Sequence, residues 1–244
     1  MTSYFISGAS SGLGAEMARQ LSERGDGVAL AARRIELLEE LAQDLGSVPG
    51  AVTTHALDVT DPVAVDRVIR HADAVHGGLD VVVVNAGRGG GGRLGTGTLD
   101  QNRQVIETNL VGVLAQAESA LSLFRSRGHG HLVLVSSVVA RRGLPGGAAV
   151  YSATKAAVAT LGAGLRTEFA GSDIHITTLR PGYIETELTA KVPKRFKTPV
   201  RRGVASMVRA MDDRVGDAVV PAWPWKAVDR VLPLIPSRII RRFM

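Results

Sequence analysis

The segment Ser3-Tyr-Phe-Ile-Ser-Gly-Ala-Ser-Ser-Gly-Leu-Gly14 joins a short apolar run to a stretch of helix formers. The apolar run predicts a first strand, and the residues from 12 onward predict a first helix. Glycines at 8, 12 and 14 permit a tight turn and a close approach of the backbone to a ligand. The helix that follows begins with free N–H groups and the positive end of its dipole, which suit a pyrophosphate.

The position of this turn, between an N-terminal strand and a helix, favours dinucleotide binding over an ordinary glycine-rich turn. The spacing is G-x-x-x-G-x-G, and the absence of a following Gly-Lys-Ser/Thr excludes a P-loop. The residues of the turn expected to bind the cofactor are Gly8, Ser10, Ser11, Gly12, Leu13 and Gly14.

Apolar runs alternate with helical patterns along the chain. Strands are predicted at 3–7, 27–32, 51–56, 80–84, 131–136 and 174–179, and helices near 12–24, 34–45, 61–76, 99–127 and 151–170. This alternation indicates parallel strands joined by crossover helices. Strands such as 81–84 are apolar throughout, as expected when helices cover both faces of a sheet. The sequence therefore predicts a single-domain α/β protein with a Rossmann-type, doubly wound parallel sheet.

The regular alternation fades beyond Pro181, where a helix near 199–212 and a short strand at 218–220 are predicted. We expect residues 1–190 to form the dinucleotide-binding and catalytic core. Residues 191–244 are expected to form a substrate lid and a basic, apolar C-terminal extension of the same domain. The glycine-rich run 87–93 predicts a mobile loop.

The composition excludes several classes of protein. The 244 residues include no cysteine, which excludes a disulfide scaffold and a cysteine-based metal site. The six histidines show no metal-binding spacing beyond His129-Gly-His131, so no metal is expected. No signal peptide is recognised, and no apolar segment approaches the roughly 20 residues of a spanning helix. These features favour a cytoplasmic protein.

The net charge of +6 is concentrated at one end of the chain. Residues 191–244 carry 13 basic and 4 acidic residues, whereas 1–190 carry 16 and 19. Aromatic residues are scarce and no recognition motif appears, so nucleic acid is not an expected partner. Residues 223–244 combine tryptophans and aliphatic residues with five Lys/Arg, as interfacial segments do. A peripheral membrane contact and a lid or subunit-packing segment are both open for this tail.

The end of the second strand bears on the choice between NAD and NADP. Ala32 stands where an acidic residue would hold the ribose 2′-OH of NAD. The guanidinium of Arg33 favours a 2′-phosphate, so we expect NADP(H). The alternative is that Arg33 and Arg34 only begin a solvated helix. Other residues expected near the cofactor are Arg34 itself, Asp58 and Val59 after the third strand, and Asn85, Ala86 and Gly87 after the fourth.

Tyr151 and Lys155 lie four residues apart within a predicted helix. This spacing places the phenol and the ammonium on one helix face. The unperturbed pKa of tyrosine is about 10, and a nearby cation moves it toward the operating pH. The pair therefore predicts an acid–base site, although the same spacing also occurs on solvated helix faces.

Taken together, these motifs resemble the classical short-chain dehydrogenase/reductase family over roughly residues 3–190. The matching positions are Gly8-x-x-x-Gly12-x-Gly14, Asp58, Asn85-Ala-Gly87, Asn109, Ser136-Ser137, Tyr151-x-x-x-Lys155 and Pro181-Gly-x-x-x-Thr186. The resemblance implies an oxidoreductase that reduces a carbonyl or oxidises the matching alcohol. It also implies a homodimer or higher homo-oligomer that pairs the 99–127 and 151–170 helices.

The resemblance implies a role for each matching residue. Tyr151 would donate a proton to the substrate oxygen, which Ser137 would hydrogen-bond. Lys155 would hold the nicotinamide ribose and lower the pKa of Tyr151. Asn109, in the middle of the 99–127 helix, would help hold a water that links Lys155 to solvent. At the nicotinamide, Pro181 and Gly182 would turn the chain over the cofactor, and the Ile184 backbone and Thr186 would bond the carboxamide.

Three departures from the family pattern are visible. Thirteen residues separate Ser137 from Tyr151, one more than is common, and the run 143–147 absorbs the extra residue. The usual double asparagine before Ala-Gly reads Val84-Asn85. The C-terminal end is closer to reductases resembling 11β-hydroxysteroid or retinol dehydrogenases, which favours a lipophilic substrate over a ketoacyl one.

The leading hypothesis is an NADP(H)-dependent carbonyl reductase or alcohol dehydrogenase acting on a lipophilic small molecule. A catalytically silent dinucleotide-binding regulator is the first alternative, although a sensor does not need the Ser–Tyr–Lys set. An epimerase or dehydratase acting on a nucleotide sugar is the second alternative. It usually needs a larger C-terminal domain than the residues after Pro181 provide.

Overall fold

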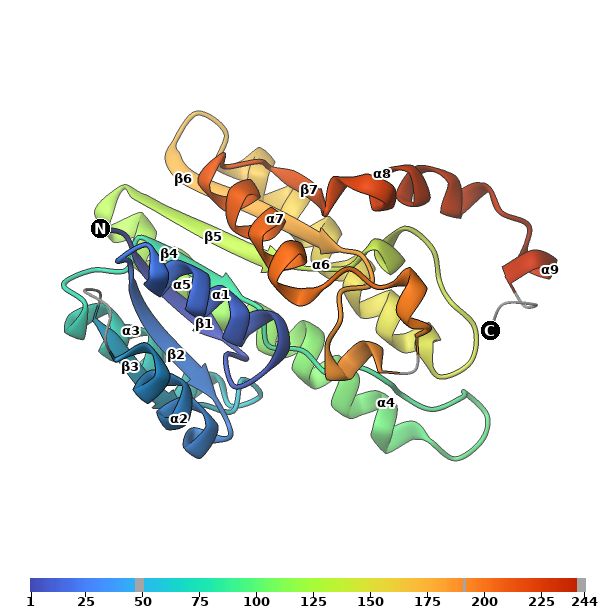
Figure 1. The fold of residues 1–244 in the computed structure, drawn as a ribbon, viewed down its shortest axis with the longest axis horizontal. Helices are drawn as coiled ribbons and strands as arrows, with labels where there is room; N and C mark the ends of the chain where they lie inside the picture. Colours follow the sequence, from blue (N-terminus) through green and yellow to red (C-terminus); the bar gives the residue numbers. More distant parts are fainter. Residues whose placement is uncertain (47–50, 191, 241–244) are drawn as a thin grey trace.

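The structure is a computed structural model that describes residues 1–46, 51–190 and 192–240 (Figure 1). A parallel sheet runs through the molecule in the order β3-β2-β1-β4-β5-β6-β7. The strands are β1 (Ser3–Ser7), β2 (Gly27–Ala32), β3 (Val52–Ala56), β4 (Val81–Val84), β5 (His129–Val135), β6 (Asp173–Pro181) and β7 (Asp217–Val220). The predicted Rossmann-type fold is confirmed, and the first two strands have the predicted bounds.

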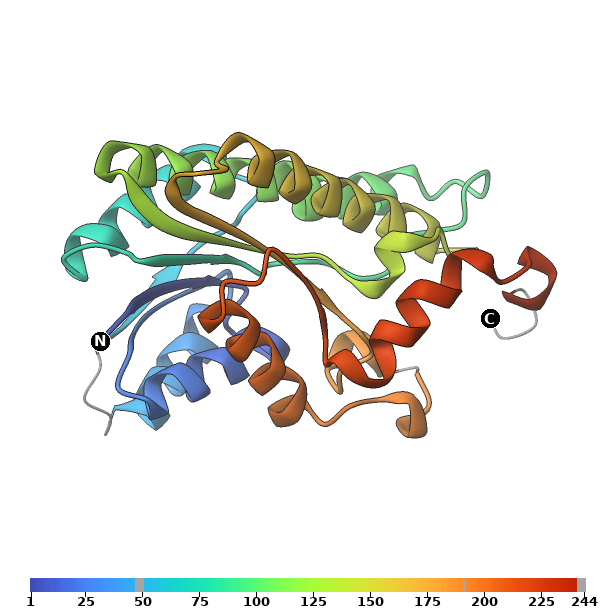
Figure 2. The same ribbon diagram turned by 90° about the horizontal axis from the view of Figure 1, so that it is seen from above.

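Helices cover both faces of the sheet (Figure 2). One face carries α1 (Gly12–Glu23), α2 (Ile35–Leu45) and α7 (Val200–Asp212). The other carries α3 (Pro62–Val75), α4 (Leu99–Ile106), α5 (Gly112–Arg127) and α6 (Ala148–Glu168). The short helices α8 (Ala222–Val231) and α9 (Ser237–Ile240) lie beyond one end of the sheet.

Two apolar cores result from the alternation of side chains along the strands. In β1, Tyr4 and Ile6 enter the core under α1 and α7, while Phe5 enters the core under α3 and α5. Successive side chains of a strand point to opposite faces, so a strand buried on both faces must be apolar throughout. This explains why the strands read as continuous apolar runs.

The predicted helix 99–127 is interrupted in the structure. Its middle, Glu107–Val111, is a π-helical turn (η1) between α4 and α5. Such a turn accommodates one extra residue and is found at many functional sites. Helical periodicity alone did not reveal it, because one inserted residue hardly changes the apolar pattern.

Within the described residues, no helix combines the length and the apolar character needed to cross a bilayer.

Candidate functional site

A cavity of about 730 Å³ lies at the carboxyl ends of the parallel strands. In open α/β sheets, ligands bind at this edge, near the point where the strand order reverses. Most predicted site residues line the cavity. They are Gly8, Ser10, Ser11, Gly12, Leu13, Arg33, Arg34, Asp58, Val59, Asn85, Ala86, Gly87, Ser137, Tyr151, Lys155, Pro181, Gly182, Ile184 and Thr186. Gly14 and Asn109, by contrast, do not line it.

The glycine turn leaves its backbone bare toward the cavity. Gly8 and Gly12 have φ values of +67° and +58°, which favour glycine. A Cβ on Gly14 would lie 2.3 Å from the carbonyl oxygen of Gly8, so Gly14 lets α1 pack against the turn. A Cβ on Gly12 would lie 3.3 Å from the Thr186 methyl across the site. This cradle, at the start of α1, fits the pyrophosphate of a dinucleotide.

Hydrogen bonds from β4 hold the glycine turn in place. The amide of Asn85 donates to the carbonyl oxygen of Ser7 at 2.9 Å. The backbone N–H groups of Asn85 and Ala86 both donate to the Ser7 hydroxyl at 3.0 Å. The single asparagine that remains before Ala86 therefore joins the carboxyl ends of β1 and β4.

The two arginines after β2 reach the same cavity. Arg34 donates to the hydroxyls of Ser10 and Ser11, at 3.1 and 3.2 Å. Arg33 is exposed and makes no hydrogen bond or ion pair with any residue that the structure describes. Thr60 backbone hydrogen bonding and, more weakly, the charge of Arg33 lower the pKa of Asp58. A cationic rim therefore borders the turn on the side of β2.

Tyr151 and Lys155 enter the cavity from α6, with the Lys155 Nζ 5.9 Å from the centre of the tyrosine ring. Burial raises the pKa of Tyr151 to about 12, although a hydrogen bond with Ser137 acts in the opposite direction. Burial also lowers the pKa of Lys155 to about 8. Burial is the largest influence on the phenol in the protein alone, and the role of Lys155 in lowering the pKa of Tyr151 stays a prediction.

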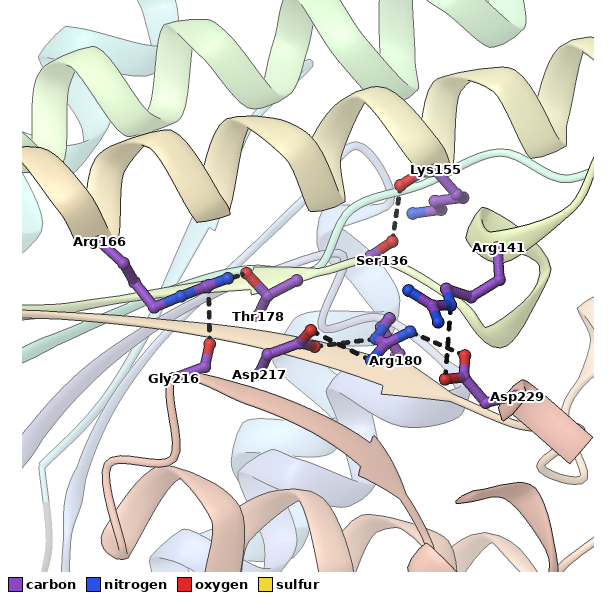
Figure 3. A network of polar contacts seen from close by, with 9 residues as sticks. All are labelled: Ser136, Arg141, Lys155, Arg166, Thr178, Arg180, Gly216, Asp217 and Asp229. Carbon is purple, nitrogen blue, oxygen red and sulfur yellow. Dashed lines mark hydrogen bonds and ion pairs between the residues drawn. The ribbon is translucent and has the colours of Figure 1, made fainter. Parts of the chain in front are cut away.

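The two consecutive serines that follow β5 have different hydrogen-bond partners. The Ser136 hydroxyl donates to the carbonyl oxygen of Lys155 at 2.7 Å, inside the protein (Figure 3). The Lys155 ammonium in turn donates to the carbonyl oxygen of Val135 at 2.9 Å. Both serines line the cavity, and Ser137 lies beside Tyr151 despite the extra residue between them. Because the Ser136 hydroxyl donates its proton to the backbone, the assignment of Ser137 to the substrate oxygen stays the prediction.

Asn109 lies in the π-helical turn η1, fully buried. Its side chain accepts from the Arg88 N–H at 2.7 Å and donates to the Arg88 carbonyl oxygen at 2.8 Å. It also donates to the Thr154 hydroxyl at 3.3 Å. A Cβ on Gly87 would lie 3.5 Å from both the Asn109 oxygen and the Lys155 nitrogen, so these groups converge on one backbone position. Its role in holding a water stays a prediction.

The predicted mobile loop 87–93 is attached at both ends. Asn109 binds its first part, as described above. Asn102, buried in α4, accepts from the N–H of Gly92 at 3.0 Å and donates to its carbonyl oxygen at 3.2 Å. The composition of the loop gave no sign of these anchors, because Asn102 and Asn109 lie 10 and 21 residues further along the chain than the loop residues they bind.

The far end of the cavity is apolar, and sequence reasoning missed most of it. Its wall includes Val139, Leu144, Ala148, Tyr183 and Leu188. These residues lie next to assigned positions, directly after Ser137, before Tyr151 and after Gly182, and this proximity was the available signal. Lys194, Arg195 and Lys197, which are basic residues near the start of the expected 191–244 lid and extension, do not line the cavity. Lys191 lies outside the described residues.

The C-terminal tail divides into a buried and an exposed part. Trp225 of α8 is buried, whereas Trp223 and Leu234 are 77% and 79% exposed. The tail consists of α8, a short 3₁₀ turn at Leu232–Leu234 that contains Pro233, and α9, which follows Pro236. The side chains of Ile239 and Ile240, and residues 241–244, lie outside what the structure describes.

Comparisons with known proteins agree with this geometry. The family described as "short chain dehydrogenase" matches residues 3–196. An uncharacterized oxidoreductase of Mycobacterium tuberculosis is 46% identical over 241 residues, covering 98% of this chain and 95% of that protein.

Two solved structures place nicotinamide cofactors in similar folds. An alcohol dehydrogenase from the archaeon Thermococcus sibiricus, complexed with 5-hydroxy-NADP, is 30% identical with a TM-score of 0.78. That match covers 90% of this chain and 95% of the other. A short-chain dehydrogenase from Sphingobium yanoikuyae in complex with NADPH is 27% identical with a TM-score of 0.81, covering 95% and 93%.

Proposed function

The chain belongs to the short-chain dehydrogenase/reductase family of nicotinamide-dependent oxidoreductases, and from this premise we propose that it is an NADP(H)-dependent carbonyl reductase. In the reverse direction it oxidises the matching secondary alcohol. The observation that carries the proposal is one cavity that contains the glycine cradle, the Arg33–Arg34 rim, and Ser137 with Tyr151 and Lys155. A dinucleotide-binding regulator needs only the first two of these features.

The protein supplies proton transfer and orientation. Pro181, Gly182, Ile184 and Thr186 would hold the nicotinamide, which would supply the hydride when bound. The raised pKa of Tyr151 keeps its phenol protonated at neutral pH, which is the form that donates a proton to the carbonyl oxygen. The Ser137 hydroxyl donates a hydrogen bond to the same oxygen and stabilises its developing charge. The Lys155 ammonium, close to the ring, then stabilises the phenolate that remains.

The preference for NADP(H) over NAD(H) rests on the cationic rim. Arg33 makes no internal ion pair among the described residues, so its charge is available to a 2′-phosphate. Arg34 lies over the two serines of the turn, close to where a phosphate would bind. Ala32 offers no carboxylate to the 2′-OH of NAD, and an acidic side chain there would repel a phosphate.

The substrate is a lipophilic small molecule. The end of the cavity beyond Tyr151 is lined mainly by aliphatic and aromatic side chains, including Tyr183. The buried Trp225 packs against Tyr183. Such a wall favours the burial of apolar surface. In this proposal the segment after Pro181 is a lid over the substrate, and 191–244 complete the same domain.

A homodimer and a peripheral membrane contact complete the proposal. Leu99, Ile106, Val111 and Leu114 are exposed along α4, η1 and α5, which suits pairing with a second copy.

Trp223 and Leu234 of the tail are exposed beside basic residues, which suits an anionic lipid surface. Co-sedimentation with vesicles containing phosphatidylserine tests the second contact. Wild-type protein is expected to pellet and Trp223→Ser/Leu234→Ser to stay in solution; equal recovery of both would contradict it.

The proposed reaction is tested by carbonyl-dependent oxidation of NADPH. Wild-type protein is incubated with NADPH and, separately, with steroid ketones, retinal, aryl ketones and a β-ketoacyl thioester. We expect NADPH consumption with lipophilic ketones or aldehydes and little with the thioester. No carbonyl-dependent consumption across the panel would contradict the proposal.

A further inference from the structure

One face of α8 is buried against the two loops that flank the reaction centre. Trp225 and Asp229 are four residues apart, so they lie on the same side of the helix. Both residues are buried, at 7% and 4% exposure. A buried carboxylate requires cationic partners, and the partners of Asp229 come from the turn after Ser137 and from the end of β6.

The carboxylate of Asp229 joins an arginine of β6 to an arginine of the 3₁₀ turn that follows β5 (Figure 3). One oxygen accepts from Arg180 at 2.7 Å, and the other lies 3.7 Å from the Nε of Arg141. Arg180 is near the end of β6, just before Gly182 and Tyr183. Arg141 ends the 3₁₀ turn that begins directly after Ser137. Asp229 therefore links the loop that carries Ser137 to the loop that borders the nicotinamide and substrate ends of the cavity.

Trp225 makes a parallel contact one helical turn away. A Cβ on Gly182 would lie 2.1 Å from the indole, so the ring packs directly on the glycine backbone. The same ring meets Tyr183 edge-to-face, with centroids 5.1 Å apart. The indole thus fixes the approach of Tyr183 to the cavity that it lines.

Arg142, the residue after Arg141, also connects the loop after Ser137 to the C-terminal tail. Arg142 donates to the carbonyl oxygen of Pro233 at 2.8 Å and to the hydroxyl of Ser237 at 3.0 Å. The consecutive arginines 141 and 142 therefore both end in contacts with the C-terminal segment. Neither arginine belongs to a family motif, and in the structure both contact the C-terminal segment.

The sheet itself does not hold the two loops together. The paired register of β5 and β6 ends at Val135 and Leu179, and one more backbone bond joins Ser136 to Leu179. Beyond that point β6 continues to Pro181 beside β7 and no longer beside β5, so contacts with α8 span the distance between the end of β6 and the turn after Ser137.

We propose that α8 is the positioning element of the reaction centre, with Asp229 as a positioning residue that acts on Ser137 through Arg141 and on Tyr183 through Arg180. The role in catalysis rests on the proposed function, whereas the role in holding the loops does not. Loss of the carboxylate frees the Ser137 turn, so the hydroxyl meets the substrate oxygen less often in the correct geometry. The contacts of the dinucleotide with the distant glycine turn are unaffected.

The test compares Asp229→Asn with a matched control, Asp217→Asn. Asp217 pairs with the same Arg180, at 2.8 Å, but it lies on β7 and makes no contact with Arg141. Hydrogen exchange monitored by mass spectrometry reports the two loops without any substrate. We expect exchange in peptides covering 137–142 and 182–186 to accelerate about tenfold in Asp229→Asn, with wild-type rates there in Asp217→Asn.

The kinetic measurement uses the best substrate of the NADPH oxidation panel. In Asp229→Asn, kcat is expected to fall about tenfold or more, and the Kd for NADPH to rise by a smaller factor, because the glycine turn and Arg33 keep their contacts while the 182–186 segment loosens. Arg141→Gln, whose side chain is half exposed, provides a second variant if Asp229→Asn folds poorly. It should reproduce the loss, and the double variant should lose no more than either single one.

Two results would overturn the proposal: unchanged exchange at 137–142 in both Asp229→Asn and Arg141→Gln, or equal effects in Asp229→Asn and Asp217→Asn. A wild-type protein that shows no carbonyl-dependent NADPH consumption with any member of the panel refutes the proposed reaction instead. The exchange measurement still decides the positioning role in that case.

Discussion

At the residue scale, burial shifts the pKa values of Tyr151 and Lys155 in opposite directions. The i,i+4 spacing correctly placed both side chains in one cavity. It could not predict that burial raises the pKa of the phenol to about 12 and lowers that of the ammonium to about 8. Desolvation depends on what surrounds a group in three dimensions, whereas the sequence shows only its neighbours along the helix.

The lowered pKa of Lys155 predicts the pH dependence of reduction. Lys155 is charged below pH 8 and loses its proton above it, so stabilisation of the Tyr151 phenolate weakens as the pH rises. We expect kcat/KM for carbonyl reduction to fall above about pH 8. Lys155→Arg keeps its charge over the whole range and should show a lower rate without this fall. An unchanged alkaline limb in Lys155→Arg would refute the assignment to Lys155.

The exposed Arg33 predicts the choice of cofactor. Arg33→Ala removes a charge-assisted contact to the 2′-phosphate. We expect this loss to raise the Kd of NADPH about 10- to 100-fold. The Kd of NADH should change about twofold or less. Arg209→Ala, on the exposed side of α7, serves as the control. Isothermal titration with both cofactors measures the preference, and an equal loss for NADH and NADPH in Arg33→Ala argues against the 2′-phosphate contact.

At the element scale, strands and glycine turns were predictable and side-chain anchors were not. Strands such as β1 and β2 are apolar because both faces are covered, and this appears directly in the sequence. The π-helical turn at Asn109 and the attachment of the glycine loop by Asn102 depend on contacts between segments far apart. The docking of α8 through Asp229 is of the same kind. Local patterns cannot show such pairings, because each partner alone reads as an ordinary polar residue.

His131, which is buried on β5, predicts how the free energy of unfolding depends on pH. Burial, followed by the charges of His175 and Arg214, lowers the pKa of His131 from 6.5 to about 4. Between these values the unfolded chain binds the proton and the folded chain does not. The free energy of unfolding therefore falls as the pH drops, by about 2 kcal/mol at pH 5 for this group.

Urea denaturation at pH 7.5 and 5.0 measures this contribution. His131→Gln should lose about 2 kcal/mol less than wild type between the two pH values. His129→Gln, an exposed position on the same strand, should lose as much as wild type. Equal losses in wild type and His131→Gln would show that the buried histidine does not titrate as described.

At the scale of the whole molecule, the reaction centre is assembled from both ends of the chain. The glycine cradle comes from the first 14 residues, and α8 supports the Ser137 loop from the C-terminal end. Figure 2 shows α8 beyond the end of the sheet, away from the helices that cover its two faces. The sequence predicted the core from its motifs, but the tail has no motif and its contacts emerge only in the folded chain.

The exposed apolar positions on α4, η1 and α5 predict a homodimer. Small-angle scattering should give about twice the 25.7 kDa mass of the chain. Val111→Glu/Leu114→Glu places two charges on this surface and should give a monomer with an unchanged fold by circular dichroism. A monomeric wild type, or a double variant that stays dimeric, would place the interface elsewhere or exclude it.

The most direct test of the account is the turnover of Tyr151→Phe with NADPH and the best carbonyl substrate. Removal of one hydroxyl takes away the proton donor but leaves the glycine cradle and Arg33 in place. The account predicts a loss of about 10²- to 10⁴-fold in kcat, with a Kd for NADPH within about twofold of wild type. Turnover near the wild-type rate would contradict the assignment of Tyr151 as the acid.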